Sequence, residues 1–300
     1  GDIMIEYIIG RNSASLRADR FLLKATTAPS SLIYKAFRKK DVKINGKWIK
    51  EDYILYEGDI LRIYIKEDFQ KEKTVKSCTL TAPILYEDEN IIIFNKPSAL
   101  PCQPDTNHQD GTLSDMLKSY LIEKGEYNPK EESSFSPALC NRLDTNTSGL
   151  VIGAKNAQSL RDMNEQIRLR NVRKYYLCRL ENIPAEKAAF VNTHIIKEET
   201  TNISRISDSG KEISMEYIVL QEMDGTALTQ VLLHTGRSHQ IRAYFASINC
   251  PLVGDKKYGA KSGGGQKLVA HKILFSFPDE YDGILSYLKG QQIQLDRVDI

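Results

Sequence analysis

The chain has 300 residues, of which 41% are hydrophobic and 27% are charged, and its formal net charge at pH 7 is +2. These values are typical of a globular protein with room for two domains, and no apolar run approaches the roughly 20 residues of a membrane span. We therefore expect no membrane partner. So small a net charge does not by itself indicate nucleic-acid binding, which would depend on where the basic residues gather.

The five cysteines and five histidines give no pattern for a disulfide framework or a metal centre. The cysteines are scattered, odd in number and never spaced as C-x-x-C, and the histidines lack H-x-x-x-H or H-x-E spacing. We expect no metal, no cofactor and a reducing, cytoplasmic location.

A small first domain is predicted over residues 11–66. Apolar positions 32, 33, 36 and 37 predict an amphipathic helix that Ser30 or Ser31 can cap. Asn45-Gly46 marks a hairpin turn, and residues 60–65 predict the closing strand. The exposed side of the helix carries four basic residues: Lys35, Arg38, Lys39 and Lys40. Such a face is most often only a solvated surface, and RNA binding is the alternative.

A linker is predicted over residues 67–81, which are rich in Lys and Glu and have no apolar period. A larger second domain follows over residues 82–300. Thr112 and Asp115 have the spacing of a capping box for one helix, and a second helix carries the apolar positions 160, 163 and 167. Predicted strands outnumber helices: 84–86, 91–94, 150–154, 175–180, 213–220 and 227–234. This pattern favours an α+β fold with a mainly antiparallel mixed sheet and packed helices.

One carboxylate, Asp144, stands in a turn of small residues before the apolar strand 150–154. Such a position presents a side chain at the edge of a core, and a nearby arginine would favour its ionised form. A loop aspartate is more often a turn former that bonds its own backbone. Local spacing leaves both interpretations open.

Four stretches, in this order, resemble the RluA-type pseudouridine synthases: 95–100 (N-K-P-S-A-L), 142–150 (R-L-D-T-N-T-S-G-L), 173–176 (R-K-Y-Y) and 234–242 (H-T-G-R-S-H-Q-I-R). Shorter matches continue through residues 250–259 and 270–278, so the resemblance covers roughly residues 82–280. Residues 13–66 resemble the alpha-L RNA-binding motif shared by a small-subunit ribosomal protein and tyrosyl-tRNA synthetase.

The resemblance implies that uridine in RNA is isomerised to pseudouridine after the nucleotide is flipped out, with no cofactor consumed. It implies that Asp144 is the nucleophile, that Tyr176 stacks on the base and accepts a proton at C5, and that Arg237 pairs with Asp144. Without the resemblance, Tyr176 would be interpreted as a core tyrosine and Arg237 as a phosphate contact. The atom that Asp144 attacks stays open.

Lys174, His239 and Arg242 are expected to contact the RNA backbone or to have a scaffold role, and Arg142 to touch RNA or to brace the turn. A helix predicted to begin at Ser238 would aim its positive end at a phosphate. The chain has Asn141 and Tyr244 where the family often has histidine, which puts local RNA contacts in question.

Two other functions compete with this interpretation. A non-catalytic RNA-binding or ribosome-assembly factor is disfavoured because Asp144, Tyr176 and Arg237 are all retained. A glycosidase or nucleosidase typically needs two carboxylates beside the bond, and only one is marked here. We expect a monomeric enzyme that acts on structured RNA, and the appended first domain favours ribosomal over transfer RNA.

Overall fold

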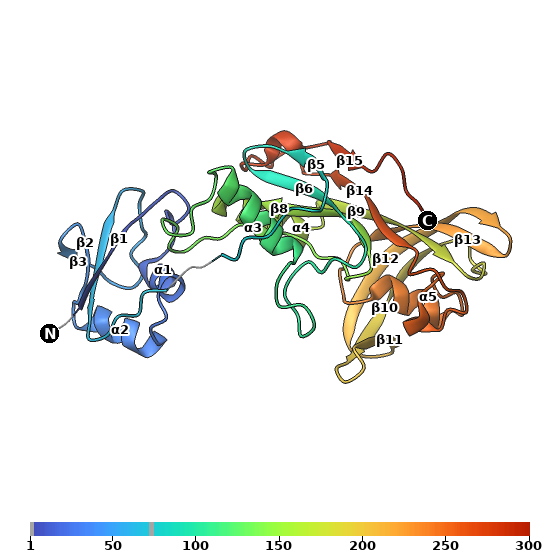
Figure 1. Cartoon of the computed structure of the whole chain (residues 1–300), viewed down its shortest axis with the longest axis horizontal. Helices are drawn as coiled ribbons and strands as arrows, with labels where there is room; N and C mark the ends of the chain where they lie inside the picture. Colours follow the sequence, from blue (N-terminus) through green and yellow to red (C-terminus); the bar gives the residue numbers. More distant parts are fainter. Residues whose placement is uncertain (1–2, 72–74) are drawn as a thin grey trace. The chain divides into compact units, whose positions relative to one another are not determined.

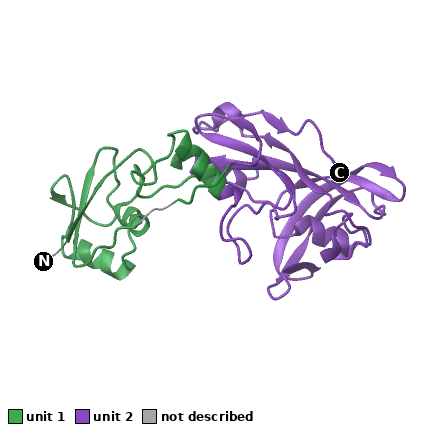
Figure 2. Ribbon diagram, viewed as in Figure 1, with its two compact units in different colours: residues 1–79, 115–138, 155–158 green, residues 80–114, 139–154, 159–300 purple. Residues whose placement is uncertain are grey.

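The computed structural model describes residues 3–71 and 75–300. It divides into two compact units, shown in Figure 2. The first comprises residues 1–79, 115–138 and 155–158, and the second comprises 80–114, 139–154 and 159–300. The predicted domains ran continuously, whereas the compact first unit also takes in two segments from further along the chain.

Within the first unit, residues 3–71 form a four-stranded antiparallel sheet, in the order β1-β4-β2-β3, with two α-helices. Its elements are β1 (Ile3–Ile8), α1 (Ala18–Ala25), α2 (Ser30–Arg38), β2 (Val42–Ile44), β3 (Lys47–Trp48) and β4 (Ile60–Ile65). Since β1 pairs with β4, the unit begins before the predicted residue 11. Its core includes the buried Phe21, Ile33 and Leu61.

Local sequence explains most of the first unit. Asn45 and Gly46 both have positive φ, 51° and 83°, as the predicted two-residue hairpin turn requires. The predicted serine cap is wrong, because α2 already includes Ser30 and is preceded by Pro29 without a side-chain cap. The predicted linker also begins too early: Gln70 bridges to Thr26 and Phe69 packs on the core. Its residues 72–74 lie outside the described residues.

The second unit contains a large sheet with the main order β11-β10-β12-β13-β9-β14-β8-β6-β5 (Figure 1). Its pairings are antiparallel except for the parallel contact between β8 and β14, so the predicted α+β class with a mainly antiparallel mixed sheet is confirmed. The strands along the chain are β5 (Ile84–Glu87), β6 (Ile91–Lys96), β7 (Ala138–Leu139), β8 (Ser148–Ala154), β9 (Val172–Leu180), β10 (Ala188–Glu198), β11 (Ile203–Ser207), β12 (Lys211–Met223), β13 (Thr226–Leu233), β14 (Leu268–Phe275) and β15 (Gln292–Gln294).

The helices are α3 (Leu113–Glu123), α4 (Ala157–Arg168) and α5 (Gln240–Ser247), with two short 3₁₀ helices, η1 (Lys256–Tyr258) and η2 (Ser286–Leu288). Helix α3 begins directly after Thr112, as predicted. Its apolar stripe is buried at Leu113, Leu117 and Leu121.

The strand register defines two faces at the centre of this sheet. Tyr176 of β9 lies opposite Val231 of β13, which lies opposite Tyr217 of β12. Tyr217 packs against Phe245 of α5, with ring centroids 5.2 Å apart, so we call this side the α5 face. Successive side chains of a strand point to opposite faces. Tyr175 therefore belongs to the other side, which we call the open face.

Gly149 fixes the approach of β8 to β14. Its φ of 116° disfavours other residues, and an added Cβ would collide with the backbone of Ala270. This close parallel contact holds the start of β8, and with it the preceding Asp144 turn, against the strand that borders Tyr176.

Candidate active site

Asp144 occupies the turn that leads into β8. The Thr147 backbone N–H donates to the Asp144 carbonyl at 2.9 Å, and β8 begins at Ser148, two residues before the predicted strand. On the other side, the Leu143 backbone N–H donates to Cys102 Sγ at 3.3 Å. The carboxylate is left partly accessible, with 29% of its side chain exposed. Hydrogen bonds thus fix the backbone around Asp144, while its carboxylate stays partly accessible.

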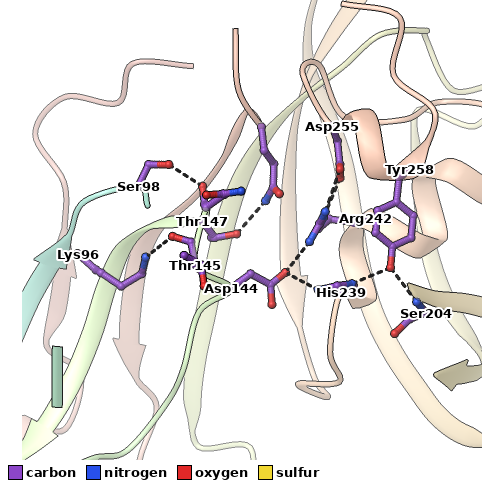
Figure 3. Close-up of polar contacts among 12 residues, drawn as sticks. Lys96, Ser98, Asp144, Thr145, Thr147, Ser204, His239, Arg242, Asp255 and Tyr258 are labelled. Carbon is purple, nitrogen blue, oxygen red and sulfur yellow. Dashed lines mark hydrogen bonds and ion pairs between the residues drawn. The ribbon is translucent and has the colours of Figure 1, made fainter. Parts of the chain in front are cut away.

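Lys96 anchors the same turn from within the core. Its Nζ donates to three backbone carbonyls, those of Leu100 at 2.7 Å and of Pro97 and Thr145 at 3.0 Å. Burial lowers the pKa of Lys96 to about 8, although the charges of Cys102 and Asp144 act in the opposite direction. Figure 3 shows Lys96 reaching the residue after Asp144.

Arg242, in the first turn of α5, is the ion-pair partner of Asp144. Its Nη1 donates to Asp144 Oδ2 at 3.2 Å, while Nε and Nη2 donate to the two oxygens of Asp255 at 2.7 and 2.9 Å (Figure 3). Burial lowers the pKa of Arg242, but the bonds and charge of Asp255 and the charge of Asp144 outweigh it, so the pKa is raised. One permanently charged guanidinium therefore joins two carboxylates.

This geometry corrects the predicted pairing of Asp144 with Arg237. Arg237 is exposed and its Nε donates to the Glu212 carbonyl at 3.4 Å. It lies in the loop before α5, whereas Arg242 lies on the inward side of the helix. Arg242 was expected to contact the RNA backbone or to have a scaffold role; its side chain is only 8% exposed and is held by Asp144 and Asp255, which disfavours the RNA contact.

His239 approaches the same carboxylate, with Nε2 3.8 Å from Asp144 Oδ2. The Tyr258 hydroxyl accepts a hydrogen bond from the Ser204 backbone N–H at 2.9 Å and lies 2.8 Å from His239 Nδ1. If the Tyr258 hydroxyl donates to Nδ1, the imidazole proton is on Nε2, facing Asp144. Burial lowers the pKa of His239 despite the nearby Asp144, so the ring is neutral. Figure 3 shows the contacts that connect Ser204, Tyr258, His239 and Asp144.

Helix α5 starts at Gln240, two residues after the predicted Ser238. His239 precedes it with a φ of 55°, in the left-handed region, and makes no side-chain cap. This uncommon conformation for a residue with a side chain turns the imidazole toward Asp144 and Tyr258.

Tyr176 projects from β9 on the α5 face and is 6% exposed. Burial raises its pKa, and the negative charge of Asp144 raises it further, which places the phenol within electrostatic reach of the carboxylate. The fold therefore brings together Asp144 from a turn, Tyr176 from a strand and Arg242 from a helix.

The other predicted RNA contacts are dispersed. Arg142 is exposed and its Nη1 donates to Gln103 Oε1 at 3.4 Å. Lys174 is half-buried two residues before Tyr176, and burial lowers its pKa. The four basic residues predicted to contact RNA from the first unit are exposed, on α2 and just beyond it: Lys35, Arg38, Lys39 and Lys40. Their roles in RNA binding stay predictions.

Three residues of the site were not assigned a role from sequence: Lys96, Asp255 and Tyr258. Each stands inside a stretch that carried the family resemblance, which was the available signal. Over residues 3–71 and 75–300, no group of three or more metal-ligating side chains gathers. In the same part of the chain, no helix has the length and apolarity to cross a bilayer.

Comparison with known proteins identifies the class. Residues 90–247 match the RNA pseudouridylate synthase family, which is more than half of the chain. A protein of Mycoplasma capricolum named uncharacterized RNA pseudouridine synthase is 32% identical over 308 residues, covering 97% of each chain. The ribosomal large subunit pseudouridine synthase C of Vibrio parahaemolyticus is 30% identical over 259 residues, covering 84% of this chain and 79% of its own.

Solved structures agree on the fold. The structure named human RNA pseudouridylate synthase domain containing 1 superposes with a TM-score of 0.53 at 20% identity, covering 76% of this chain and 94% of the human chain. The structure named human RNA pseudouridylate synthase domain containing 4 superposes with a TM-score of 0.52 at 22% identity, covering 64% of this chain and 83% of the human chain.

The chain belongs to the RNA pseudouridine synthase family. It is an isomerase that converts uridine in RNA to pseudouridine, so the predicted family, enzyme class and RNA substrate are confirmed. No finding favours the non-catalytic alternative.

Proposed function

We propose that Asp144 is the nucleophile of this reaction and that Arg242, rather than Arg237, is the arginine that pairs with it and positions it. The observation that carries the proposal is the contact between the partly accessible Asp144 carboxylate and the buried Arg242 guanidinium. A carboxylate can form a covalent adduct and later leave, and the guanidinium fixes the orientation of this one.

Tyr176 forms the wall on which the flipped uracil stacks, and its hydroxyl lies on the side from which the C5 proton is removed. Its ring is fixed by the strand pairs to β13 and β14, so it presents one orientation to the base. Arg237, exposed at the start of α5, contacts a phosphate of the RNA. Since flipping costs least where a base is already unpaired, the target is a structured RNA loop.

We propose ribosomal RNA of the large subunit as the substrate, modified by a monomeric enzyme in the cytoplasm. The names of several relatives, including that of Haemophilus influenzae at 31% identity, support the choice of RNA. The exposed basic face of α2 supports binding to a large polyanion. The free state of all five cysteines supports a reducing compartment.

The test is to map pseudouridines in RNA from cells that lack this protein and then to restore either the unaltered protein or Asp144→Ala. We expect at least one site in large-subunit ribosomal RNA to disappear and to return only with the unaltered protein. Asp208→Ala is the matched control, because Asp208 is an exposed loop aspartate. If Asp144→Ala restores the missing pseudouridine, Asp144 is not the nucleophile. If the missing pseudouridine is in transfer RNA and not in ribosomal RNA, the proposed substrate is wrong.

A further inference from the structure

The open face of the second unit carries a groove that the active site does not use. It has a volume of about 1020 Å³ and runs across β9, β13, β12 and β10. Its lining includes Tyr175, Leu232, Glu216 and Phe190.

Strand register separates this groove from Asp144. Tyr175 lies opposite Leu232, Leu232 opposite Glu216, and Glu216 opposite Phe190, so these four side chains form one row across four strands. Tyr176 and Tyr217 belong to the adjacent positions and point to the α5 face. The groove is therefore on the side of the sheet away from the target uridine.

Exposed apolar and aromatic side chains form one end of the groove. Phe190 is 65% exposed, and its ring centroid is 5.9 Å from that of His234 with a tilt of 37°. Ile218, on the neighbouring strand, is 46% exposed. Large apolar side chains grouped on a surface mark a site of interaction, and the open Phe190 ring offers a stacking surface.

Cations form the other end. Arg170 and Arg173 are exposed there, and Lys272 Nζ lies 4.1 Å from the centre of the Tyr175 ring. The acidic side chain in the lining, Glu216, is bound to His234 Nε2 at 2.7 Å. The groove thus has two exposed arginines and one acid that is already hydrogen-bonded to His234, which is complementary to a phosphate backbone rather than to a basic partner.

We propose that this groove binds a single-stranded segment of RNA outside the target nucleotide. Bases stack on Phe190 and His234, while Arg170 and Arg173 contact phosphates. The row from β9 to β10 spans three strand spacings, about 14 Å. Other four-stranded sheets stack two or three bases on such a face, and stacking tolerates any base. The proposal rests on RNA as the substrate and not on the role assigned to Asp144.

The test uses a fluorescent 12-nucleotide oligoadenylate, which has no uridine to enter the active site. Binding is measured by anisotropy in full-length protein whose Lys35, Arg38, Lys39 and Lys40 are replaced by glutamine, so that the first unit contributes little. We expect Phe190→Ala and Arg173→Glu each to raise Kd about 5-fold or more. Phe190→Tyr, which keeps a ring, should retain binding.

Arg161→Glu is the matched control, since Arg161 is an exposed arginine on α4 outside the groove. It should leave Kd within about 2-fold. Ultraviolet crosslinking of the same oligonucleotide should label the peptide that contains Phe190. Unchanged Kd in both groove variants, or an equal rise in Kd with Arg161→Glu, would overturn the proposal and leave the groove to a protein partner. Phe190→Ala and Arg173→Glu, made in the otherwise unaltered protein, should not change the isomerisation rate of a saturating short stem-loop, which separates this test from that of Asp144.

Discussion

Two sets of basic residues, one from each compact unit, lie in opposite environments. In the first unit, Lys35, Arg38 and Lys39 are exposed, and within the described residues they make no ion pair. In the second, Arg242 is buried between Asp144 and Asp255. Exposed cations contribute little to folding and are free to meet a polyanion. Buried pairs fix a geometry, and breaking one strongly destabilises the fold. The comparison separates residues that attract RNA from residues that arrange the reacting groups.

The largest effect is expected from Arg242→Ala. It leaves Asp255 buried without its partner and frees Asp144, so we expect kcat to fall at least 100-fold. The free energy of unfolding should fall by about 3–5 kcal/mol. Activity on a target stem-loop and chemical denaturation measure the two effects.

Arg237→Ala is the control for Arg242, because Arg237 belongs to the same sequence block but is exposed. Its unfolding free energy should be unchanged, and its main effect should be a higher KM. An equal decrease of kcat in the two variants would mean that the observed Arg242 pair is not the functional one.

Tyr176→Phe should reduce kcat by about 100-fold if the hydroxyl accepts a proton, and Tyr176→Leu should reduce it further by removing the stacking ring. Because burial and Asp144 both raise the pKa of Tyr176, its phenol is protonated in the free enzyme at neutral pH. A proton acceptor that must first ionise predicts that kcat rises from pH 7 to 9 in the unaltered enzyme and not in the Phe variant. Equal pH profiles would restrict Tyr176 to stacking.

Lys96→Met tests the buried charge that supports the Asp144 turn. Burial lowers the pKa of Lys96 to about 8 from its ordinary value of 10.5, so between these pH values the unfolded chain binds more protons than the folded one. Stability conferred by Lys96 therefore rises as the pH increases from 8 to 10.5. The deficit of the Met variant, measured by urea denaturation, should grow from about pH 8 to about pH 10. A deficit independent of pH would contradict the buried, charged lysine.

The smallest effect on catalysis is expected from the basic face of α2. Replacing Lys35, Arg38, Lys39 and Lys40 with glutamine should weaken binding of ribosomal RNA about 10-fold at low salt. The slope of log K against log salt should become shallower by about 0.7–0.9 for each phosphate that is no longer neutralised. Turnover at saturating RNA and the unfolding free energy should not change. A variant with Lys24, Lys47, Lys50 and Lys66 replaced controls for net charge, and an equally weakened complex there would contradict a specific face.

Elements governed by neighbouring residues could be predicted well. Asn45-Gly46 requires positive φ at both residues, and it forms the expected hairpin turn. Strands β10 and β11 were not predicted, because β10 buries only Val191 and Ile195 among polar and exposed positions. Strand β14 was noted only as a matching stretch, since a short apolar run has no period of its own.

The sequence by itself determined the family, the chemistry and the candidate carboxylate, because Asp144 and its flanking turn are encoded in one continuous block. It could not decide between Arg237 and Arg242, which lie within a few residues of each other. Only the packing of α5 on the sheet decided that Arg242 points inward to Asp144 and Asp255. The open-face groove likewise exists only after register aligns Tyr175 and Phe190 from separate strands. Local sequence specifies conformation and residue type, whereas contacts between distant segments depend on the register and packing of the whole fold.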